Sequence, residues 1–266
     1  LSVVPLFLLM GNLITESGMS RQLYRAANAF LGHFEAGLAL ATVVSCGAFS
    51  AVCGSSMATA ATMSKVAMPS MREYKYSDSL ATGAIAAGGT LGILIPPSVI
   101  LVVYGLITET DIGKLFIAGL LPGAVGILLY MAAVMVTVRL NPGSGPAGAR
   151  SSWKERLISL KGVWGINLIF IIVMGGIYAG IFTPTEAAGI GAAGAFLIAL
   201  FSGKLGPAML YRSLSNAVRT TAMLFFLVIG ALVFSNFINM TGLPMLLRDW
   251  VMGQGFSLFG VILVLI

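Results

Sequence analysis

Charged residues are scarce in this sequence: only 9% of its 266 residues are Asp, Glu, Lys or Arg, whereas 58% are hydrophobic. A soluble globular chain carries about 25% charged residues, so the composition excludes that class. The single His and the scattered acids supply neither a metal site nor a nucleophile with its base. Cys46 and Cys53 are about 10 Å apart along a helix, too far for a disulfide within the chain. We therefore expect an integral membrane protein with buried structural thiols and no cofactor.

The apolar blocks have the length of membrane-spanning helices, about 20 residues, rather than that of short alternating barrel strands. This favours an all-α, multi-span bundle, whose close packing the 33 Gly would permit. The net charge of +6 comes from dispersed Lys and Arg without a basic stripe, so no nucleic-acid partner is expected. Apolar segments reach both termini, and we expect the chain to be truncated at both. The blocks cover residues 1–16, 37–70, 80–106, 115–138, 162–181, 185–202, 220–240 and 256 onward.

The loop 139–161 carries five Lys and Arg against Glu155 alone, which predicts a cytoplasmic position by the positive-inside rule. Counting spans from this loop places both flanks of the block 37–70 inside. A straight helix of this length would be about 50 Å long, beyond a hydrocarbon core of about 30 Å. A re-entrant helical hairpin resolves both problems, with its tip at 54–56. Two ordinary spans with a tight turn would need more residues than the block contains.

A second interruption lies within residues 80–106, where Gly88 to Ser98 include two consecutive prolines. Pro96 and Pro97 remove two backbone donors and block a continuous helix. Each freed backbone group costs several kcal/mol in hydrocarbon unless something satisfies it. The alternative is that the small residues only permit close helix packing, which we favour for Gly83, Ala84 and Gly89. Packing alone, however, requires no discontinuity.

Each interruption predicts a helix end with free carbonyls, at 52–54 and 90–93, and a new helix start with free amides, at 55–57 and 97–99. Carbonyl oxygens coordinate hard cations such as Na⁺, and helix N-termini attract carboxylates. The pair of breaks therefore predicts cation-coupled uptake of an anion. The candidate substrate contacts are Ser55, Ser56, Thr90, Pro97 and Ser98. The candidate Na⁺ ligands, largely through backbone carbonyls, are Gly54, Ser55, Gly89, Thr90 and Gly92.

Residues 11–23 align without gaps with residues 235–247 at a constant offset of 224. On the predicted topology the two copies run in opposite directions, as in an inverted repeat, although short apolar matches also arise by chance. We expect 1–138 to hold most of the first repeat, 139–161 a cytoplasmic loop, 162–219 connecting helices, and 220–266 the start of the second repeat. The matching half of the site would then follow Ile266.

Other polar groups have two interpretations. The stretch 183–186 reads as a helix start with Thr185 as its N-cap and Glu186 in its first turn, or as part of a site. Asn12 and Asn236, matched by the repeat, either bond into a break or bridge helices. His33, beside Glu35, is expected at the cytoplasmic interface.

These residues resemble the large membrane subunit, DctM type, of the tripartite ATP-independent periplasmic (TRAP) transporters. The likeness covers nearly the whole chain and is carried by Pro5 to Phe7, Ser17-Gly18, Gly54 to Ser56 with Ala58-Thr59, Tyr76, Gly88 to Ser98, Tyr104, Leu115-Phe116, Gly119, Pro122-Gly123 and Thr183 to Ala188. Departures from the family pattern occur at Glu35-Ala36, Ser64 and Ser70.

The resemblance implies an elevator-type Na⁺ symporter in the bacterial inner membrane. It also implies that a periplasmic binding protein delivers the substrate and that a small four-helix membrane subunit, DctQ type, is a partner. Family substrates are mostly organic acids, including C4-dicarboxylates and sialic acid. The hairpin tip and the glycine-rich break would then contribute Na⁺ and substrate contacts.

Two rival functions remain at this point. One is an anion and Na⁺ symporter, or an anion channel, that works without a binding protein. The other is a membrane-embedded hydrolase that uses Ser55 or Ser56 as a nucleophile. The sequence offers such a nucleophile no base at membrane depth, so we expect no enzyme.

Overall fold

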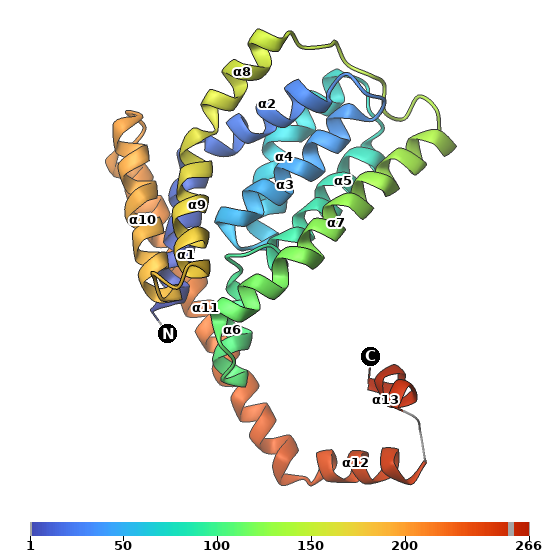
Figure 1. Cartoon of the computed structure of the whole chain (residues 1–266), viewed down its shortest axis with the longest axis vertical. Coiled ribbons are helices and arrows are strands. Elements are labelled where there is room, and N and C mark those ends of the chain that lie inside the picture. The colour runs from blue at the N-terminus through green and yellow to red at the C-terminus, as the bar shows by residue number, and fades with distance from the viewer. Residues whose placement is uncertain (1, 255–257, 266) are drawn as a thin grey trace. The chain divides into compact units, whose positions relative to one another are not determined.

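The computed structural model describes residues 2–254 and 258–265, and this part of the chain consists of helices and connections without a strand (Figure 1). The all-α class predicted from composition is confirmed. The chain forms two compact units, residues 1–220 and 221–266, which are described separately below.

Unit one holds α1 to α10 and the first part of α11. Its helices are α1 (Val3–Glu16), α2 (Met19–Leu31), α3 (Gly37–Cys53), α4 (Ser56–Glu73), α5 (Asp78–Thr90), the 3-10 helix η1 (Leu91–Ile93), α6 (Val99–Thr108), α7 (Ile112–Leu140), α8 (Trp153–Gly162), α9 (Trp164–Tyr178) and α10 (Pro184–Phe201). Unit two holds the remainder of α11 (Pro207–Met240), α12 (Leu243–Gly253) and α13 (Leu258–Leu265).

Three described helices, α7, α10 and α11, are long and apolar enough to cross a membrane. Two bent pairs, α1 with α2 (67°) and α8 with α9 (53°), bring the total to as many as five. Large apolar side chains remain exposed along α7 and α11, for example Leu121, Leu128 and Phe226. Such exposed apolar faces are those of helices that contact lipid.

The predicted hairpin is found as α3 and α4, which pack against each other on either side of a break at Gly54 and Ser55. Nearly every residue of α3 is buried, as expected for a helix that is apolar all round. Its neighbours are α2, α4, α5 and α7, which lie beside it in Figure 1. The re-entrant position of this hairpin in a bilayer stays a prediction.

The predicted discontinuous helix is found as α5, η1 and α6. The chain leaves η1 at Ile93, passes through Pro96 and Pro97, and starts α6 with Ser98 as its N-cap. Pro cannot continue a helix interior, which explains why the helix breaks here.

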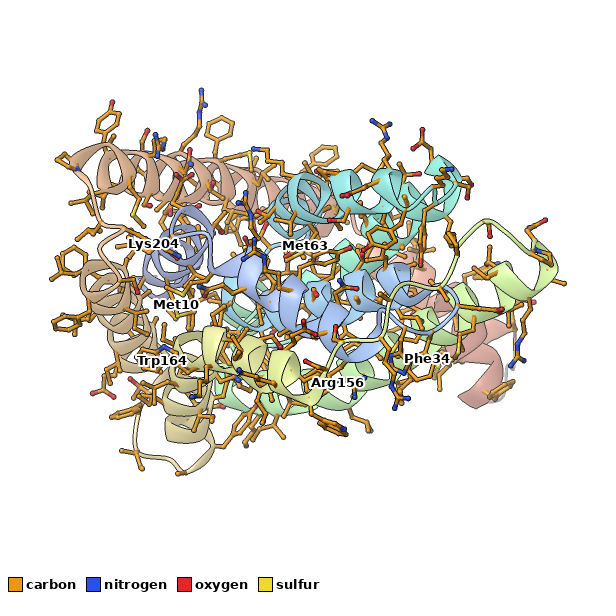
Figure 2. All side chains as sticks on the ribbon, turned by 90° about the horizontal axis from the view of Figure 1, so that it is seen from above. Met10, Phe34, Met63, Arg156, Trp164 and Lys204 are labelled. Carbon is orange, nitrogen blue, oxygen red and sulfur yellow. The ribbon has the colours of Figure 1, made fainter. Side chains whose placement is uncertain are left out.

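Three helices that carry charged residues, α2, α8 and α12, fall in segments without a predicted helix. The loop predicted at 139–161 therefore contains α8 in its second half. Arg156 of α8 is buried and faces α2, where its Nε donates to the carbonyl of Ala29 at 3.1 Å (Figure 2). This bond satisfies one of the carbonyls left free in the last turn of α2.

The local structure repeats at the offset of 224 found in the sequence. The break between α1 and α2 and the break between α11 and α12 both place a left-handed Gly at the new helix start, Gly18 (φ 72°) and Gly242 (φ 71°). The residue before each Gly donates its hydroxyl back into the helix, Ser17 to Ile14 and Thr241 to Ile238, both at 2.7 Å. This agreement supports a structural repeat, and its inverted orientation remains a proposal.

Candidate functional site

The hairpin tip and the break of the discontinuous helix touch each other through their backbones. The N–H of Val99, at the start of α6, donates to the carbonyl of Gly54 at 3.2 Å. A Cβ on Gly92 would lie 2.7 to 2.8 Å from the backbone of Ser55 and Ser56, and one on Gly54 would lie 2.5 Å from the carbonyl oxygen of Pro97. Only Gly allows this approach, so the two interruptions lie directly against each other.

Besides Gly92, two further glycines of the discontinuous helix face the two arms of the hairpin. A Cβ on Gly88 would lie 2.8 Å from the sulfur of Cys46 on α3, and one on Gly89 would lie 2.7 Å from the Cβ of Ala60 on α4. The packing role favoured for Gly89 is thereby confirmed. Gly83, for which the same role was favoured, has no atom within 4 Å of such a Cβ, so that prediction is wrong.

A glycine face on α7 encloses the break from the other side. A Cβ on Gly119 would lie 2.6 Å from the carbonyl oxygen of Leu94, and one on Gly123 would lie 2.7 Å from the side chain of Ile95. On the far side of the tip, a Cβ on Gly11 of α1 would lie 3.1 Å from the carbonyl oxygen of Cys53. The break is therefore held between the hairpin and α7, and the end of α3 lies against α1.

Two predicted site serines serve as N-caps. The Ser55 hydroxyl accepts a hydrogen bond from the Ala58 N–H at 3.4 Å, at the start of α4. The Ser98 hydroxyl accepts from the Leu101 N–H at 3.4 Å and donates to the carbonyl of Ile93 at 2.8 Å. Ser98 is fully buried, whereas Ser55 is half-buried. The Ser98 hydroxyl thus already has partners within the protein, and Ser55 keeps an accessible edge.

The Thr90 side chain lies apart from the other predicted site residues. Its hydroxyl donates to the carbonyl of Ala87 at 2.7 Å and lies 2.9 Å from the Tyr130 hydroxyl on α7. Gly89 and Gly92, on either side of it in sequence, face the hairpin instead. Pro97 is buried against Gly54.

The predicted free amides are present at the start of α4 and, in part, at the start of α6, where the Ser98 N–H has no hydrogen-bond partner within the described residues. The N–H groups of Ser56 and Met57, in the first turn of α4, have no hydrogen-bond partner within the described residues. The expectation of a free amide at Val99 is wrong, because this N–H donates to Gly54. The first turn of α4 therefore has free amides of the kind that attract an anion.

Two hydroxyls beside the tip were not predicted from the sequence. Ser50, in the last turn of α3, and Thr59, in the first turn of α4, are fully buried. Within the described part of the chain, neither hydroxyl oxygen has a hydrogen-bond partner, although the Cys53 thiol lies near the Thr59 hydroxyl. A buried polar group without a partner is costly, so these two oxygens mark the tip as a place where a ligand would be accommodated. Their only sequence signal was that each falls within four residues of the tip.

The remaining polar residues have structural roles or no partner. Thr183 and Glu186 form a reciprocal capping box at the start of α10, with bonds of 2.8 and 3.3 Å, which confirms the helix start. The expectation of Thr185 as the N-cap is wrong, because Pro184 already begins the helix and Thr183 caps it. The Asn12 side chain makes no hydrogen bond to described residues. No cluster of three or more His, Cys, Asp or Glu suited to a metal ion occurs at the described positions.

Comparison with known proteins identifies the family. The DctM component of the tripartite ATP-independent periplasmic transporters matches residues 1–266. The chain is 39% identical over 259 residues to the C4-dicarboxylate TRAP transporter large permease protein DctM of Pseudomonas aeruginosa, covering 97% of this chain and 60% of that protein. It is 35% identical to the protein of that name from Rhodobacter capsulatus, covering 96% and 61%.

The sialic acid TRAP transporter large permease protein SiaM of Vibrio cholerae is 34% identical, with 94% of this chain and 58% of that protein covered. The chain thus spans about 60% of the length of these relatives. All three are named as transport permeases rather than enzymes, which removes the hydrolase alternative. The chain belongs to the DctM family of tripartite ATP-independent periplasmic transporter components, and its apolar helices fit a multi-pass membrane protein.

Proposed function

We propose that this chain is part of the large permease of a Na⁺-coupled importer of organic acids in the bacterial inner membrane. The observation that carries the proposal is the contact between the hairpin tip and the helix break, through Val99 and Gly54. None of the predicted site residues is charged. Ligands would therefore be held by helix ends and hydroxyls, the means by which membrane transporters bind ions at depth.

The substrate and the coupling ion would bind to different groups of the tip. The free amides of Ser56 and Met57 lie at the positive end of α4 and suit a substrate carboxylate. The hydroxyls of Ser50 and Thr59, with carbonyls at the end of α3, supply the oxygen ligands that a hard cation prefers. Binding of the cation beside α4 would strengthen binding of the anion, which is the basis of coupling.

The substrate is proposed to be a C4-dicarboxylate or a similar carboxylate, because two of the relatives are named for C4-dicarboxylates. We further propose that a periplasmic binding protein delivers it and that a small membrane subunit completes the permease. Both partners follow from the tripartite family to which the chain belongs.

The test is uptake by the complete permease in proteoliposomes, with its small subunit and its binding protein. We expect uptake of a labelled dicarboxylate to require both an inward Na⁺ gradient and the binding protein. Uptake that persists when the Na⁺ gradient is replaced by a K⁺ gradient would refute the coupling. Uptake that persists without the binding protein would favour the independent symporter instead.

A further inference from the structure

The glycine-rich connection between α7 and α8 is hydrogen-bonded to the base of the hairpin, which is the end away from its tip. Residues 144–148 bond to the turn between α2 and α3 and to the turn between α4 and α5, and we call this group the base clamp. Its bonds are Ser77 N–H to Ser144 O (2.9 Å), Ala36 N–H to Gly145 O (2.9 Å), Tyr76 hydroxyl to Pro146 O (2.9 Å) and Gly148 N–H to Gly32 O (2.8 Å).

The glycines of this connection are needed for its close contacts. A Cβ on Gly148 would lie 2.8 Å from the carbonyl oxygen of Gly32, and one on Gly145 would lie 3.0 to 3.2 Å from three side chains, including the ring of Tyr76. A composition that reads as a flexible linker is thus a packed segment with regular backbone partners. The connection passes over the ends of the hairpin helices in Figure 1.

Tyr76 lies at the centre of the base clamp. Its hydroxyl accepts a hydrogen bond from the Leu38 N–H at 3.1 Å and donates to the Pro146 carbonyl. The Leu38 N–H is one of the first-turn donors of α3 that the helix itself leaves free. Burial raises the pKa of Tyr76, so its hydroxyl stays protonated and remains a donor.

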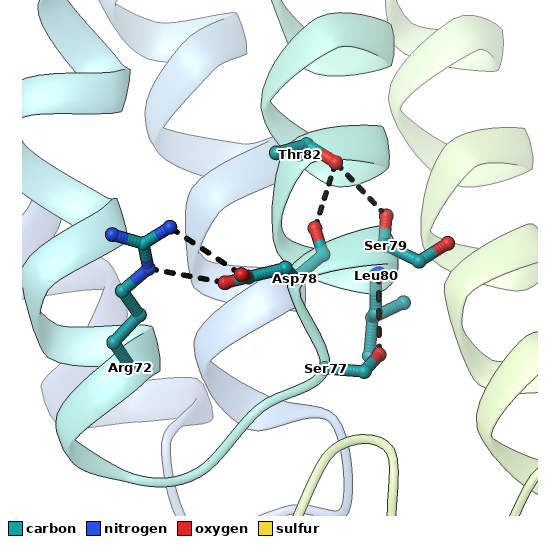
Figure 3. Close-up of polar contacts among 6 residues, drawn as sticks. All are labelled: Arg72, Ser77, Asp78, Ser79, Leu80 and Thr82. Atoms are coloured by element: carbon teal, nitrogen blue, oxygen red, sulfur yellow. Dashed lines mark hydrogen bonds and ion pairs between the residues drawn. The ribbon is translucent and has the colours of Figure 1, made fainter.

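Hydrogen bonds connect the end of α4 with the start of α5, next to Tyr76 (Figure 3). The Ser77 hydroxyl caps α5 by accepting from the Leu80 N–H at 3.3 Å. Arg72, in the last turn of α4, donates two hydrogen bonds to the carboxylate of Asp78, at 3.0 and 3.3 Å. These bonds hold the chain beside Tyr76, whose hydroxyl contacts α3.

We propose that Tyr76 is a positioning residue that fixes the base of α3 and thereby sets the height of the hairpin tip against the helix break. Its action depends on the rigidity of α3, whose 17 residues run from the clamp to the tip and are buried almost throughout. A displacement of the base along the helix axis moves Cys53 and Gly54 by the same amount. This inference rests on the proposed function, because the tip is the proposed Na⁺ and substrate site.

The test compares Tyr76→Phe with Tyr74→Phe in the complete protein. Tyr74 is half-exposed, and its hydroxyl makes no hydrogen bond to described residues, so it is the matched control. We expect Tyr76→Phe to speed hydrogen exchange at 36–40 about fivefold and to raise the Na⁺ concentration for half-maximal uptake by a similar factor. The maximal rate of uptake and the exchange of α10 should not change, and Tyr74→Phe should match the wild type.

Faster exchange along the whole protein would overturn the inference, because the tyrosine would then serve only general stability. Faster exchange at the base with unchanged Na⁺ dependence would equally overturn it. If wild-type uptake did not depend on Na⁺, the proposed function would fail instead. The exchange measurement would then still show whether Tyr76 holds the base of α3.

Discussion

At the scale of residues, the site consists of glycines and hydroxyls rather than charged groups. Each glycine at the contact has a specific neighbour, as Gly92 has the backbone of Ser55 and Ser56. The hydroxyl of Ser98 is used as a cap, whereas those of Ser50 and Thr59 are buried without partners. We propose that the two unpartnered hydroxyls beside the tip bind a ligand and that the capping hydroxyls are structural.

Thr59→Val tests this distinction. Removing a buried hydroxyl that lacks a partner should leave the apparent melting temperature unchanged or raise it. If this oxygen binds Na⁺, its loss should raise the Na⁺ concentration for half-maximal uptake about tenfold or more. Thr59→Ser should retain the wild-type value.

Thr42→Val provides the comparison, because the Thr42 hydroxyl is equally buried but already donates to the carbonyl of Leu38 at 2.7 Å. This variant should leave the Na⁺ dependence unchanged. An identical Na⁺ dependence in Thr59→Val and the wild type would show that the hydroxyl is not a ligand.

At the scale of elements, helix ends determine where the chain can bind ligands and where it only changes direction. Ser55 and Thr183 both cap a helix through their hydroxyls. The start of α10 also carries Glu186, whose carboxylate accepts a hydrogen bond from the Thr183 N–H. The start of α4 has no acidic residue in its first turn and leaves two amides free.

Thr183→Ala should affect stability and spare transport. Loss of this cap should lower the apparent melting temperature of the purified protein by about 2 °C. Because the capping box is proposed to be structural, the Na⁺ dependence of uptake should stay at the wild-type value. A shifted Na⁺ dependence with an unchanged melting temperature would place this helix start in the site instead.

The boundaries of the hairpin and of the discontinuous helix could be predicted because Gly54, Pro96 and Pro97 interrupt long apolar runs. The helices α2 and α8 were missed because segments with several charges do not stand out by average hydropathy. The side on which Thr90 lies could not be predicted either, since it depends on the rotation of α5 against α3, α4 and α7. Ser50 and Thr59 look like ordinary small residues in the sequence. Only the fold shows that their hydroxyls are buried without a hydrogen bond to described residues.

At the scale of the whole molecule, the described helices of unit one enclose one tip and one break. The chain spans about 60% of the length of its relatives, and a second tip and break related by the offset of 224 stays a prediction. The turns at Gly18 and Gly242 have the same local geometry, which supports this organisation. The site proposed here would then be one half of a symmetric pair.

The central claim is that the contact between the hairpin tip and the helix break forms the transport site. Gly92→Ala tests it most directly, since the new Cβ would lie 2.7 to 2.8 Å from the backbone of Ser55 and Ser56. Gly83→Ala, on α5, is the control, because its Cβ would enter open space.

The measurement is the initial rate of Na⁺-driven dicarboxylate uptake by the complete permease, normalised to the amount inserted. We predict a loss of about tenfold or more for Gly92→Ala and a rate close to that of the wild type for Gly83→Ala. Equal rates for the two variants would contradict the claim.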